Sequence, residues 1–295
     1  MKLTIFTPTF NRPTLLNILY GSILDSLQGT NSSDSVEWLI VDDGSTTDYS
    51  NIVSSFKEQS NFKIKYIKKK NGGKHTAFNL AIEESCGDLF VCIDDDDKLL
   101  PDSIARIFEL SKKLLKNNNG GIVGRVVDAS GKLLGKTVFE DYLESNTIEI
   151  RDKYKFWGEP EIYNVKHLKK YKFLEIENEK FLTEAYLFDK MSTDYPFIYT
   201  NVPLMVKEYL PNGLTANQLK IRIESPVGTE EYYFQRKLMC KGFINKLKAT
   251  INRQRFSCFT KKQKKRKIDF YEIIATPFSF ILKIKDKSDY KKMKK

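Results

Sequence analysis

The sequence is poor in the residues that build zinc sites and disulfide frameworks. It has four cysteines, none of them in a C-x-x-C pair, and only two histidines, His75 and His167. Structural zinc sites need clustered cysteine and histidine ligands, and small secreted domains need several paired cysteines. Neither class of protein is therefore expected.

Long apolar runs and the common nucleotide-binding fingerprints are also missing. No stretch offers about 18 uninterrupted apolar residues, and the opening "MKLTIFTPTFNR" has no apolar signal-peptide core. No G-x-G-x-x-G follows the first expected strand, and in "NGGKHT" His75 stands where a phosphate loop needs Ser or Thr. We expect a protein that is neither secreted nor membrane-spanning, with no dinucleotide cofactor.

Acidic residues are absent from one long segment near the end of the chain. Residues 232–268 hold thirteen Lys or Arg and no Asp or Glu, whereas the whole chain carries a net charge of +11. The rest of the chain therefore sums to −2, so the basic character belongs to this segment. The charge of the segment bears on the kind of partner that it binds.

What the chain does have is 295 residues, 41% of them hydrophobic, arranged in an alternating pattern. Buried parallel strands are predicted at 3–6, 36–41, 62–67 and 89–93, and amphipathic helices at 16–27, 48–59, 75–84 and 104–115. This β-α-β-α order predicts an α/β fold with a doubly wound, mostly parallel sheet. Further strands are expected near 120–128 and 197–210, with a helix over 179–191.

Polar clusters follow each of the four strands: "TPTFNR", "DDGSTTD", "KKKNGGKH" and "DDDD". In open α/β sheets the carboxyl ends of the strands form the ligand crevice, so these clusters are expected to converge. The run Asp94, Asp95, Asp96 and Asp97 exceeds what a helix cap needs, which favours a divalent-ion site over the alternative, an acidic surface turn. Carboxylates without nearby histidine or thiolate suit Mg²⁺ or Mn²⁺.

Two other clusters allow either a structural or a binding role. Lys74 follows a Gly-rich turn at a helix N-terminus, where it could meet an anion, or the glycines could simply form the turn. Asp42 and Asp43 could make the turn after the second strand or accept hydrogen bonds from a nucleoside. Trp157 is either a core aromatic or a platform for an acceptor sugar.

Together these motifs resemble the family 2 glycosyltransferases of the GT-A fold, over about residues 1–220. The resemblance rests on "TPTFNRPTLL", "WLIVDDGSTTD", "NGGKHTAFNLAI", "IDDDDKLLPDSI" and "EKFLTEAYLF", which occur in the family's order and spacing. It implies an inverting transfer of a sugar from a nucleotide-diphosphate donor, most simply a UDP-sugar, to a hydroxyl of a glycan acceptor. Bacterial relatives commonly build surface polysaccharides on a lipid carrier, which suggests a lipid-linked acceptor.

The resemblance also implies roles for particular residues. Thr7, Pro8, Asp42 and Asp43 would line the nucleotide pocket, Asp94 would lie near the ribose, and Asp94 and Asp96 would hold Mn²⁺ or Mg²⁺. Asp95 occupies a variable position of the motif. The family's later Glu-Asp pair reads Glu184-Ala185 here, which makes Glu184 the candidate base. Its spacing from Phe181, Leu187 and Phe188 also predicts that it lies on the apolar stripe of a helix; the alternatives are a salt bridge to a lysine, or Asp189 or Glu161 as base.

The predicted organisation is a catalytic domain over 1–220, with a nucleotide-sugar half (1–97) and an acceptor half (98–220), followed by a basic amphipathic helical region (221–295). Cations beside the short apolar run "IIATPFSFILKIK" favour an anionic membrane surface as partner, so we expect a cytoplasmic protein held peripherally at the inner face of the plasma membrane. Two other classes stay open: a metal-dependent phosphatase or nucleotidyltransferase, and a nucleic-acid-binding protein that uses the basic segment.

Overall fold

The computed structural model of the chain describes residues 1–28, 35–156, 158–207, 217–260 and 266–293. These residues form two compact units. The first comprises Met1–Asn71, Thr76–Lys172 and Lys190–Glu208, and the second comprises Gly72–His75, Phe173–Asp189 and Tyr209–Lys295. The predicted domain boundary near residue 220 stays a prediction.

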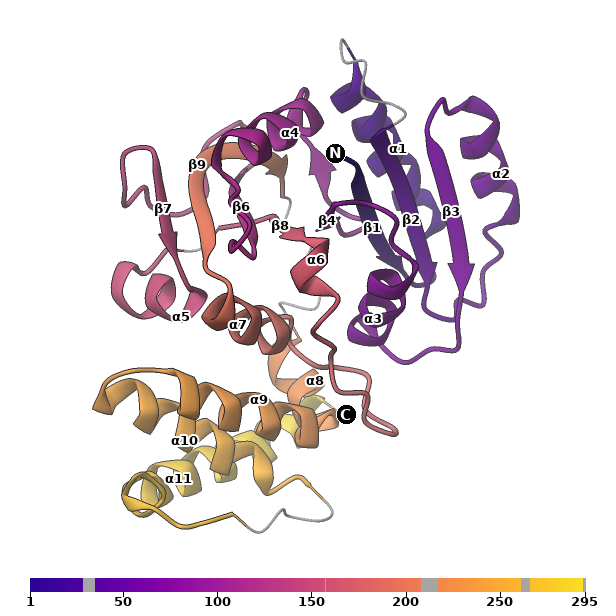
Figure 1. Ribbon diagram of the computed structural model, residues 1–295. Coiled ribbons are helices and arrows are strands. Elements are labelled where there is room, and N and C mark those ends of the chain that lie inside the picture. Colours follow the sequence, from indigo (N-terminus) through magenta and orange to yellow (C-terminus); the bar gives the residue numbers. More distant parts are fainter. Residues whose placement is uncertain (29–34, 157, 208–216, 261–265, 294–295) are drawn as a thin grey trace. The chain divides into compact units, whose positions relative to one another are not determined.

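The first unit is built on one mixed sheet with the strand order β3-β2-β1-β4-β8-β6-β9-β5, and β7 pairs with β9 (Figure 1). Its strands are β1 (Leu3–Thr9), β2 (Val36–Asp42), β3 (Lys63–Lys68), β4 (Leu89–Cys92), β5 (Lys98–Leu99), β6 (Gly121–Val127), β7 (Tyr142–Ser145), β8 (Glu161–Asn164) and β9 (Phe197–Val206). β3, β2, β1 and β4 run parallel, and β8 enters antiparallel between β4 and β6. The expected α/β class with a mostly parallel sheet is confirmed.

Helices of this unit follow the predicted alternation. They are α1 (Pro13–Leu27), α2 (Ser50–Gln59), α3 (Lys74–Glu84), α4 (Ser103–Leu114), α5 (Thr147–Glu149) with the π-helical turn η2 (Ile150–Tyr154), and α6 (Val165–Leu168). The α3 helix begins in the second unit, to which Lys74 and His75 belong. Leu16, Leu19 and Ile23 recur at three to four residues along α1 and are fully buried in the core with Ile5 and Trp38. Burial of this stripe, rather than helix propensity, holds α1 on the sheet.

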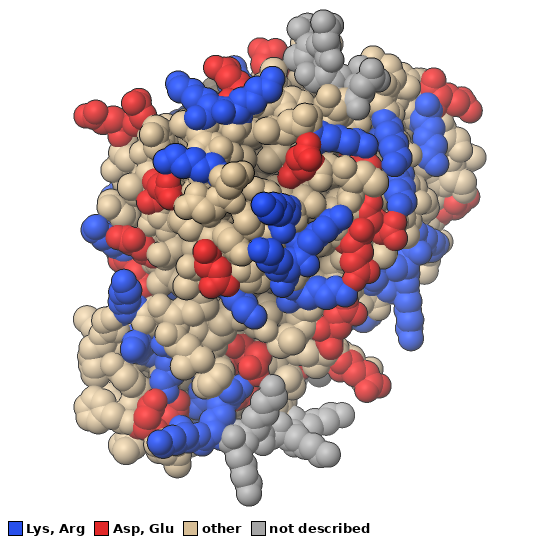
Figure 2. Space-filling view, viewed as in Figure 1, with Lys and Arg blue, Asp and Glu red and all other residues tan. Residues whose placement is uncertain are grey.

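The edge strand β3 differs from its buried neighbours. β1 and β2 are buried along their whole length, whereas β3 buries only Ile64 and carries Lys63, Lys65 and Lys68. Figure 2 shows Lys and Arg side chains gathered on the side where β3 lies. Charged edge residues discourage pairing with another chain's strand, which fits the position of β3 at the end of the sheet.

The strand register brings the polar loops together at the carboxyl ends of the parallel strands. Thr9 of β1 lies opposite Asp42 of β2, and Asp42 lies opposite Lys68 of β3. The Asp43 amide donates to the Thr9 carbonyl at 2.9 Å, and the Ile93 amide donates to the Phe6 carbonyl at 2.9 Å. The loops after β1, β2 and β4 therefore begin side by side, as expected for a crevice at the carboxyl ends of parallel strands.

The second unit is helical. α7 (Ala185–Asp194) has its first half here, and α8 (Gln218–Glu224), α9 (Pro226–Met239), α10 (Phe243–Ser257) and α11 (Phe270–Met293) follow. α10 packs against both α9 and α11. Among the described residues no helix is long and apolar enough to cross a membrane.

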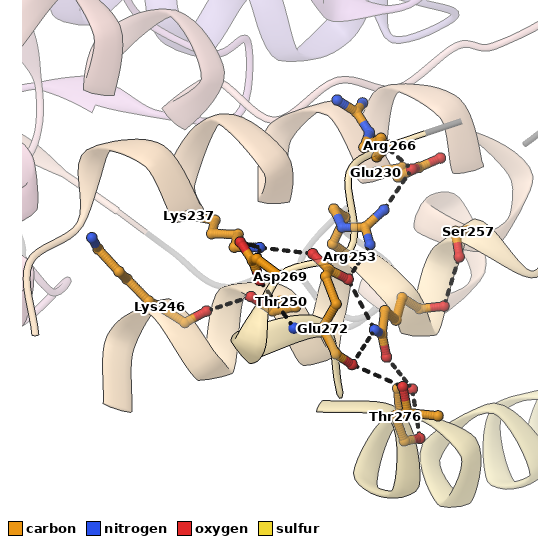
Figure 3. A network of polar contacts seen from close by, with 12 residues as sticks. Glu230, Lys237, Lys246, Thr250, Arg253, Ser257, Arg266, Asp269, Glu272 and Thr276 are labelled. Carbon is orange, nitrogen blue, oxygen red and sulfur yellow. Dashed lines mark hydrogen bonds and ion pairs between the residues drawn. The ribbon is translucent and has the colours of Figure 1, made fainter. Parts of the chain in front are cut away.

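A buried polar network joins the last three helices (Figure 3). Arg253 of α10 contacts Glu230 of α9 at 3.1 Å and also pairs with Glu272 of α11. Lys237 of α9 donates to Glu272 at 2.7 Å and to Asp269 at 2.8 Å. Burial raises the pKa of Glu272, but hydrogen bonds from Lys237, Gln254 and Arg253 outweigh it, so the net shift is downward.

This network changes the reading of the basic segment. Nine of its thirteen cations lie in the described residues, and five of these form ion pairs within the second unit: Arg236, Lys237, Arg253, Arg255 and Arg266. Their carboxylate partners come from parts of the chain on either side of the segment. Those five charges therefore stabilise the helical unit, and the segment is not a continuous row of solvated cations.

Candidate active site

The four aspartates after β4 alternate between exposed and buried positions. Asp94 and Asp96 are partly exposed, whereas Asp95 and Asp97 are buried. The alternation begins at the end of β4, where Val91 is buried and Cys92 is partly exposed, and it runs on through the loop. Two carboxylates separated by one residue thus reach the surface of the first unit, and the other two belong to its interior.

Asp95 is held by the loop after β1. Its carboxylate accepts a hydrogen bond from the Thr9 hydroxyl at 2.8 Å and pairs with Arg12 at 2.5 Å. Burial raises the pKa of Asp95 to about 7, although Arg12 and Thr9 act in the opposite direction. Arg12 also contacts Asp96 at 3.2 Å, so one guanidinium bridges a buried and an exposed carboxylate.

Asp97 lies beside a second cation from another part of the sheet. Lys207 follows β9, pairs with Glu159 at 2.5 Å, and is electrostatically coupled to Asp97. Burial raises the pKa of Asp97 to about 7, against the lowering effect of Lys207. The pKa of Lys207 is itself shifted above its usual value: burial lowers it, but Glu159, Asp97 and Asp94 outweigh that effect. Cations from two separate loops therefore face the acidic run.

The residues predicted to line the nucleotide pocket are mostly occupied by structural bonds. Asp42 is fully buried and accepts from the Ser45 amide and the Tyr66 hydroxyl, both at 2.7 Å. Thr7 is also fully buried, and its hydroxyl accepts from the Trp38 indole at 2.9 Å. For Asp42, the turn-forming role left open by the sequence is what the structure displays.

Asp43 and Pro8 stand beside these two. Pro8 lies in the buried part of β1. Asp43 pairs with Lys69 at 2.8 Å, and its carbonyl accepts from the Asn71 amide group at 2.7 Å. Gly44 shows why this turn needs glycine: its φ is +81°, and a Cβ would lie 2.6 Å from the Asn71 backbone nitrogen.

In the second unit, Lys74 and Glu184 form an ion pair at 2.5 Å. The prediction that Glu184 lies on the apolar stripe of a helix is wrong. The α7 helix begins at Ala185, the Glu184 carbonyl accepts its first hydrogen bonds, and the side chain is 45% exposed. The carboxylate avoids a desolvation cost by standing before the helix, where it meets Lys74. His75 is the second residue of α3 and is buried.

The turn before Lys74 also requires glycine. Gly73 has φ +93°, and a Cβ there would lie 2.0 Å from the Lys180 carbonyl oxygen. Any side chain would displace the 180–184 segment or the turn. Two sequence motifs about 110 residues apart are thus in direct contact within the second unit, which sequence spacing could not reveal.

The two alternative candidates for the base, Asp189 and Glu161, lie in other surroundings. Asp189 is fully buried and lies 3.7 Å from Arg236, and Glu161 stands in β8 of the first unit. Trp157 lies outside the described residues.

The donor set of the acidic run fits a hard divalent ion. The part of the chain that the structure describes contains no cluster of three or more His, Cys, Asp or Glu side chains placed to hold a metal. Asp94 and Asp96 nevertheless offer two oxygen ligands, and Mg²⁺ or Mn²⁺ commonly takes its remaining ligands from waters and substrate phosphates. Zinc, which prefers nitrogen and sulfur ligands, does not fit.

Sequence reasoning missed the two cations at the acidic run. Arg12 was visible in "TPTFNRP" as a cation in the loop after the first strand. Lys207 carried no local signal, because its approach depends on the pairing of β9 with β6 and β5.

Comparison with known proteins identifies the class of this fold and site. The sequence model described as glycosyl transferase family 2 matches residues 4–174, more than half of the chain. The chain therefore belongs to glycosyl transferase family 2. The phosphatase, nucleotidyltransferase and nucleic-acid-binding readings give way to this result.

The chain is similar to several named glycosyltransferases over part of their length. It is 34% identical to the glycosyltransferase RC0461 of Rickettsia conorii over 118 residues, which are 40% of this chain and 18% of RC0461. It is 28% identical to the poly(ribitol-phosphate) β-N-acetylglucosaminyltransferase TarS of Staphylococcus aureus over 134 residues, 44% of this chain and 23% of TarS. The matches thus span less than a quarter of either relative.

Solved structures show the same fold. The crystal structure of S. aureus TarS 1–349 aligns with a TM-score of 0.63 at 14% identity, covering 97% of this chain and 81% of that one. The mannosyltransferase PcManGT from Pyrobaculum calidifontis, in complex with GDP-Man and Mn²⁺, aligns with a TM-score of 0.54 at 16% identity, over 98% and 83% of the two chains. At these identities the likeness establishes the GT-A fold.

Proposed function

We propose that the chain is an inverting, metal-dependent glycosyltransferase that uses a UDP-sugar and a hydroxyl of a glycan acceptor. The observation that carries this proposal is the alternation of the acidic run, which leaves Asp94 and Asp96 partly exposed after β4 while Asp95 and Asp97 are buried. TarS 1–349 has been solved with UDP-GlcNAc, and PcManGT has been solved with GDP-Man and Mn²⁺. These complexes support the proposal that the present chain binds a nucleotide sugar and a divalent ion.

The donor and metal roles follow from the exposed carboxylates. Asp94 and Asp96 would hold Mn²⁺ or Mg²⁺, which when bound offsets the charge that builds on a leaving diphosphate. Asp43 and the backbone around Thr7 and Pro8 would contact the nucleoside, with Asp42 shaping the turn that carries Asp43. Asp94 would also lie near the ribose.

Glu184 is the proposed general base. Its carboxylate takes the proton from the acceptor hydroxyl while the hydroxyl oxygen forms a bond to the anomeric carbon. The bond from that carbon to the diphosphate breaks on the opposite face, so the configuration inverts. Lys74, which pairs with Glu184, would orient that carboxylate and contribute positive charge toward the diphosphate.

The acceptor is proposed to be a lipid-linked glycan of surface polysaccharide synthesis. We place the enzyme at the cytoplasmic face of the plasma membrane, held peripherally through the region after residue 220. Support comes from the remaining cations of residues 232–268 and from the apolar residues of α11.

A donor panel tests the proposal. Wild-type protein is incubated with UDP-, GDP- and dTDP-sugars, with and without Mn²⁺, and free sugar and free nucleotide diphosphate are both measured. The proposal expects slow hydrolysis of a UDP-sugar only when Mn²⁺ is present. Turnover that is unchanged by removing all divalent ions would contradict the metal role, and preferred hydrolysis of a GDP- or dTDP-sugar would contradict the nucleotide assignment.

A further inference from the structure

The helix α11 carries its polar residues inside and its apolar residues outside. Four of its residues are buried: Glu272, Ala275, Ser279 and Asp286. The Ser279 hydroxyl donates to the Gln254 side chain of α10 at 2.8 Å, and Asp286 pairs with Arg255, which also belongs to α10. Figure 3 shows Glu272 and Thr276 on the side of α11 that meets the polar network. α11 is therefore fixed to its unit by hydrogen bonds and ion pairs.

Its opposite face is an exposed apolar stripe. Ile273, Phe280, Ile281 and Ile284 expose between 58% and 66% of their surface. Their spacing of three, four and seven residues places them on one side of a helix with about 3.6 residues per turn, and Pro277 falls on the same side. An amphipathic helix normally buries such a face, so this orientation is the reverse of what packing within the chain would produce.

The stripe continues onto the start of α10. Phe270 at the beginning of α11 lies 6.2 Å, centroid to centroid, from the ring of Phe243, which is itself 47% exposed. Ile244 beside it is 64% exposed. We define the outer apolar face of the second unit as Phe243, Ile244, Phe270, Ile273, Pro277, Phe280, Ile281 and Ile284. Contiguous exposed apolar surface of this kind marks an interaction site.

The charges around this face decide which partner fits it. Lys285 and Lys287 are exposed, and at about 100° per residue they lie on either side of Ile284. Between Ile273 and Ser288 the sequence contains one acidic residue, Asp286, which is buried on the inner side. From Ile273 to Ile284 the apolar face is therefore bordered by cations, and the carboxylate next to Phe270, Asp269, is paired with Lys237. Two copies joined through it would bring like charges together, whereas an anionic lipid surface would neutralise them.

We infer that the outer apolar face of α10 and α11 inserts into the headgroup region of an anionic bilayer. The apolar side chains enter the boundary between headgroups and acyl chains, and the flanking lysines meet the lipid phosphates. The inference rests on the proposed function only for the purpose of the membrane contact, which is to bring the enzyme to a lipid-linked acceptor. The main contact with the bilayer is then the apolar face and not the basic segment 232–268, because five cations of that segment are already paired.

Flotation of the full-length protein with vesicles tests the inference. The vesicles contain either phosphatidylglycerol and phosphatidylcholine in equal amounts or phosphatidylcholine alone. The test variant combines Phe280→Glu and Ile281→Glu, and both residues are exposed enough to be replaced without a change in the core. The matched control is Ile18→Glu, an exposed apolar residue of α1 in the first unit. Circular dichroism and donor hydrolysis are measured for all three proteins.

Wild type and Ile18→Glu are expected to float with the anionic vesicles, and the double variant to bind at least about tenfold more weakly. Equal flotation of all three proteins overturns the inference, as does a wild type that fails to float. A wild-type dimer that the double variant converts to a monomer, without lipid binding, would assign the face to a second copy and also overturn it. Donor hydrolysis separates the two proposals, because it should be equal in all three proteins whether or not they bind lipid.

Discussion

The ion pair between Glu184 and Lys74 allows the proposed base to be separated from a purely structural carboxylate. Glu184→Gln keeps the shape of the side chain and removes its charge, and Lys74→Gln breaks the same ion pair while leaving the carboxylate. If Glu184 serves only to hold Lys74, the two variants should behave alike. If Glu184 accepts the acceptor's proton, they should differ in which kinetic constant changes.

The structure sets the expected magnitudes. Both side chains of the pair are partly exposed, 24% for Lys74 and 45% for Glu184, so losing the pair should cost about 0–1 kcal/mol of folding stability. Losing a general base lowers kcat by roughly 10² to 10⁴, which corresponds to about 3–5 kcal/mol in the activation barrier. The loss of activity would thus far exceed any loss of folding.

The assay is steady-state transfer to an acceptor glycan, with kcat and the donor KM measured for each variant. Glu184→Gln should lower kcat by that factor with little change in the donor KM, and Lys74→Gln should raise the donor KM. Glu83→Gln is the matched control, because Glu83 also forms an exposed ion pair, with Lys172, and has no proposed role in catalysis. Equal losses in the two site variants, or a Glu184→Gln enzyme as active as Glu83→Gln, would refute the base assignment.

Three further predictions concern other parts of the molecule. Asp96→Asn should abolish Mn²⁺-dependent donor binding, measured by calorimetry, whereas Asp95→Asn should affect it far less because that carboxylate is buried against Arg12; equal effects would contradict the assignment. Gly73→Ala should lower the melting temperature, since strain at φ +93° costs about 1–3 kcal/mol before the clash with the Lys180 carbonyl is counted, and an unchanged melting curve would count against this turn geometry. Glu272→Gln should destabilise the second unit by about 1–3 kcal/mol in denaturant titration, because it removes one of the two carboxylates that pair with each of the buried cations Lys237 and Arg253. Since the native pKa of Glu272 lies below its usual value, its stabilising contribution is present above that value and should disappear as the pH falls through the native pKa; a Glu272→Gln protein with the same acid unfolding curve as wild type would speak against this.

The parts of the fold that depend on local periodicity could be predicted from the sequence. The first four strands and the helices between them lie where their apolar spacing indicated, because burial of one face decides both kinds of element. The antiparallel entry of β8 between β4 and β6 could not be predicted, because strand pairing over long separations leaves no local pattern.

The candidate site shows the same division. The acidic run and its place after a buried strand were readable, and so was the polar loop that contains Arg12. The pairing of Lys207 with Glu159, the contact between Lys74 and Glu184, and the start of α7 after Glu184 all depend on tertiary contacts. The outward apolar face of α11 was visible only as a short apolar run, since sequence gives the stripe but not the side that packs.

Thermal melting with donor and metal tests the central claim most directly. Wild type and Asp96→Asn are heated with UDP-GlcNAc, with Mn²⁺, with both, and with neither. The proposed function predicts that UDP-GlcNAc and Mn²⁺ together raise the melting temperature of wild type by more than the sum of their separate effects, and that Asp96→Asn loses this excess while melting normally without ligands. An equal excess in the two proteins would contradict the claim that the exposed carboxylates after β4 hold the metal that holds the donor.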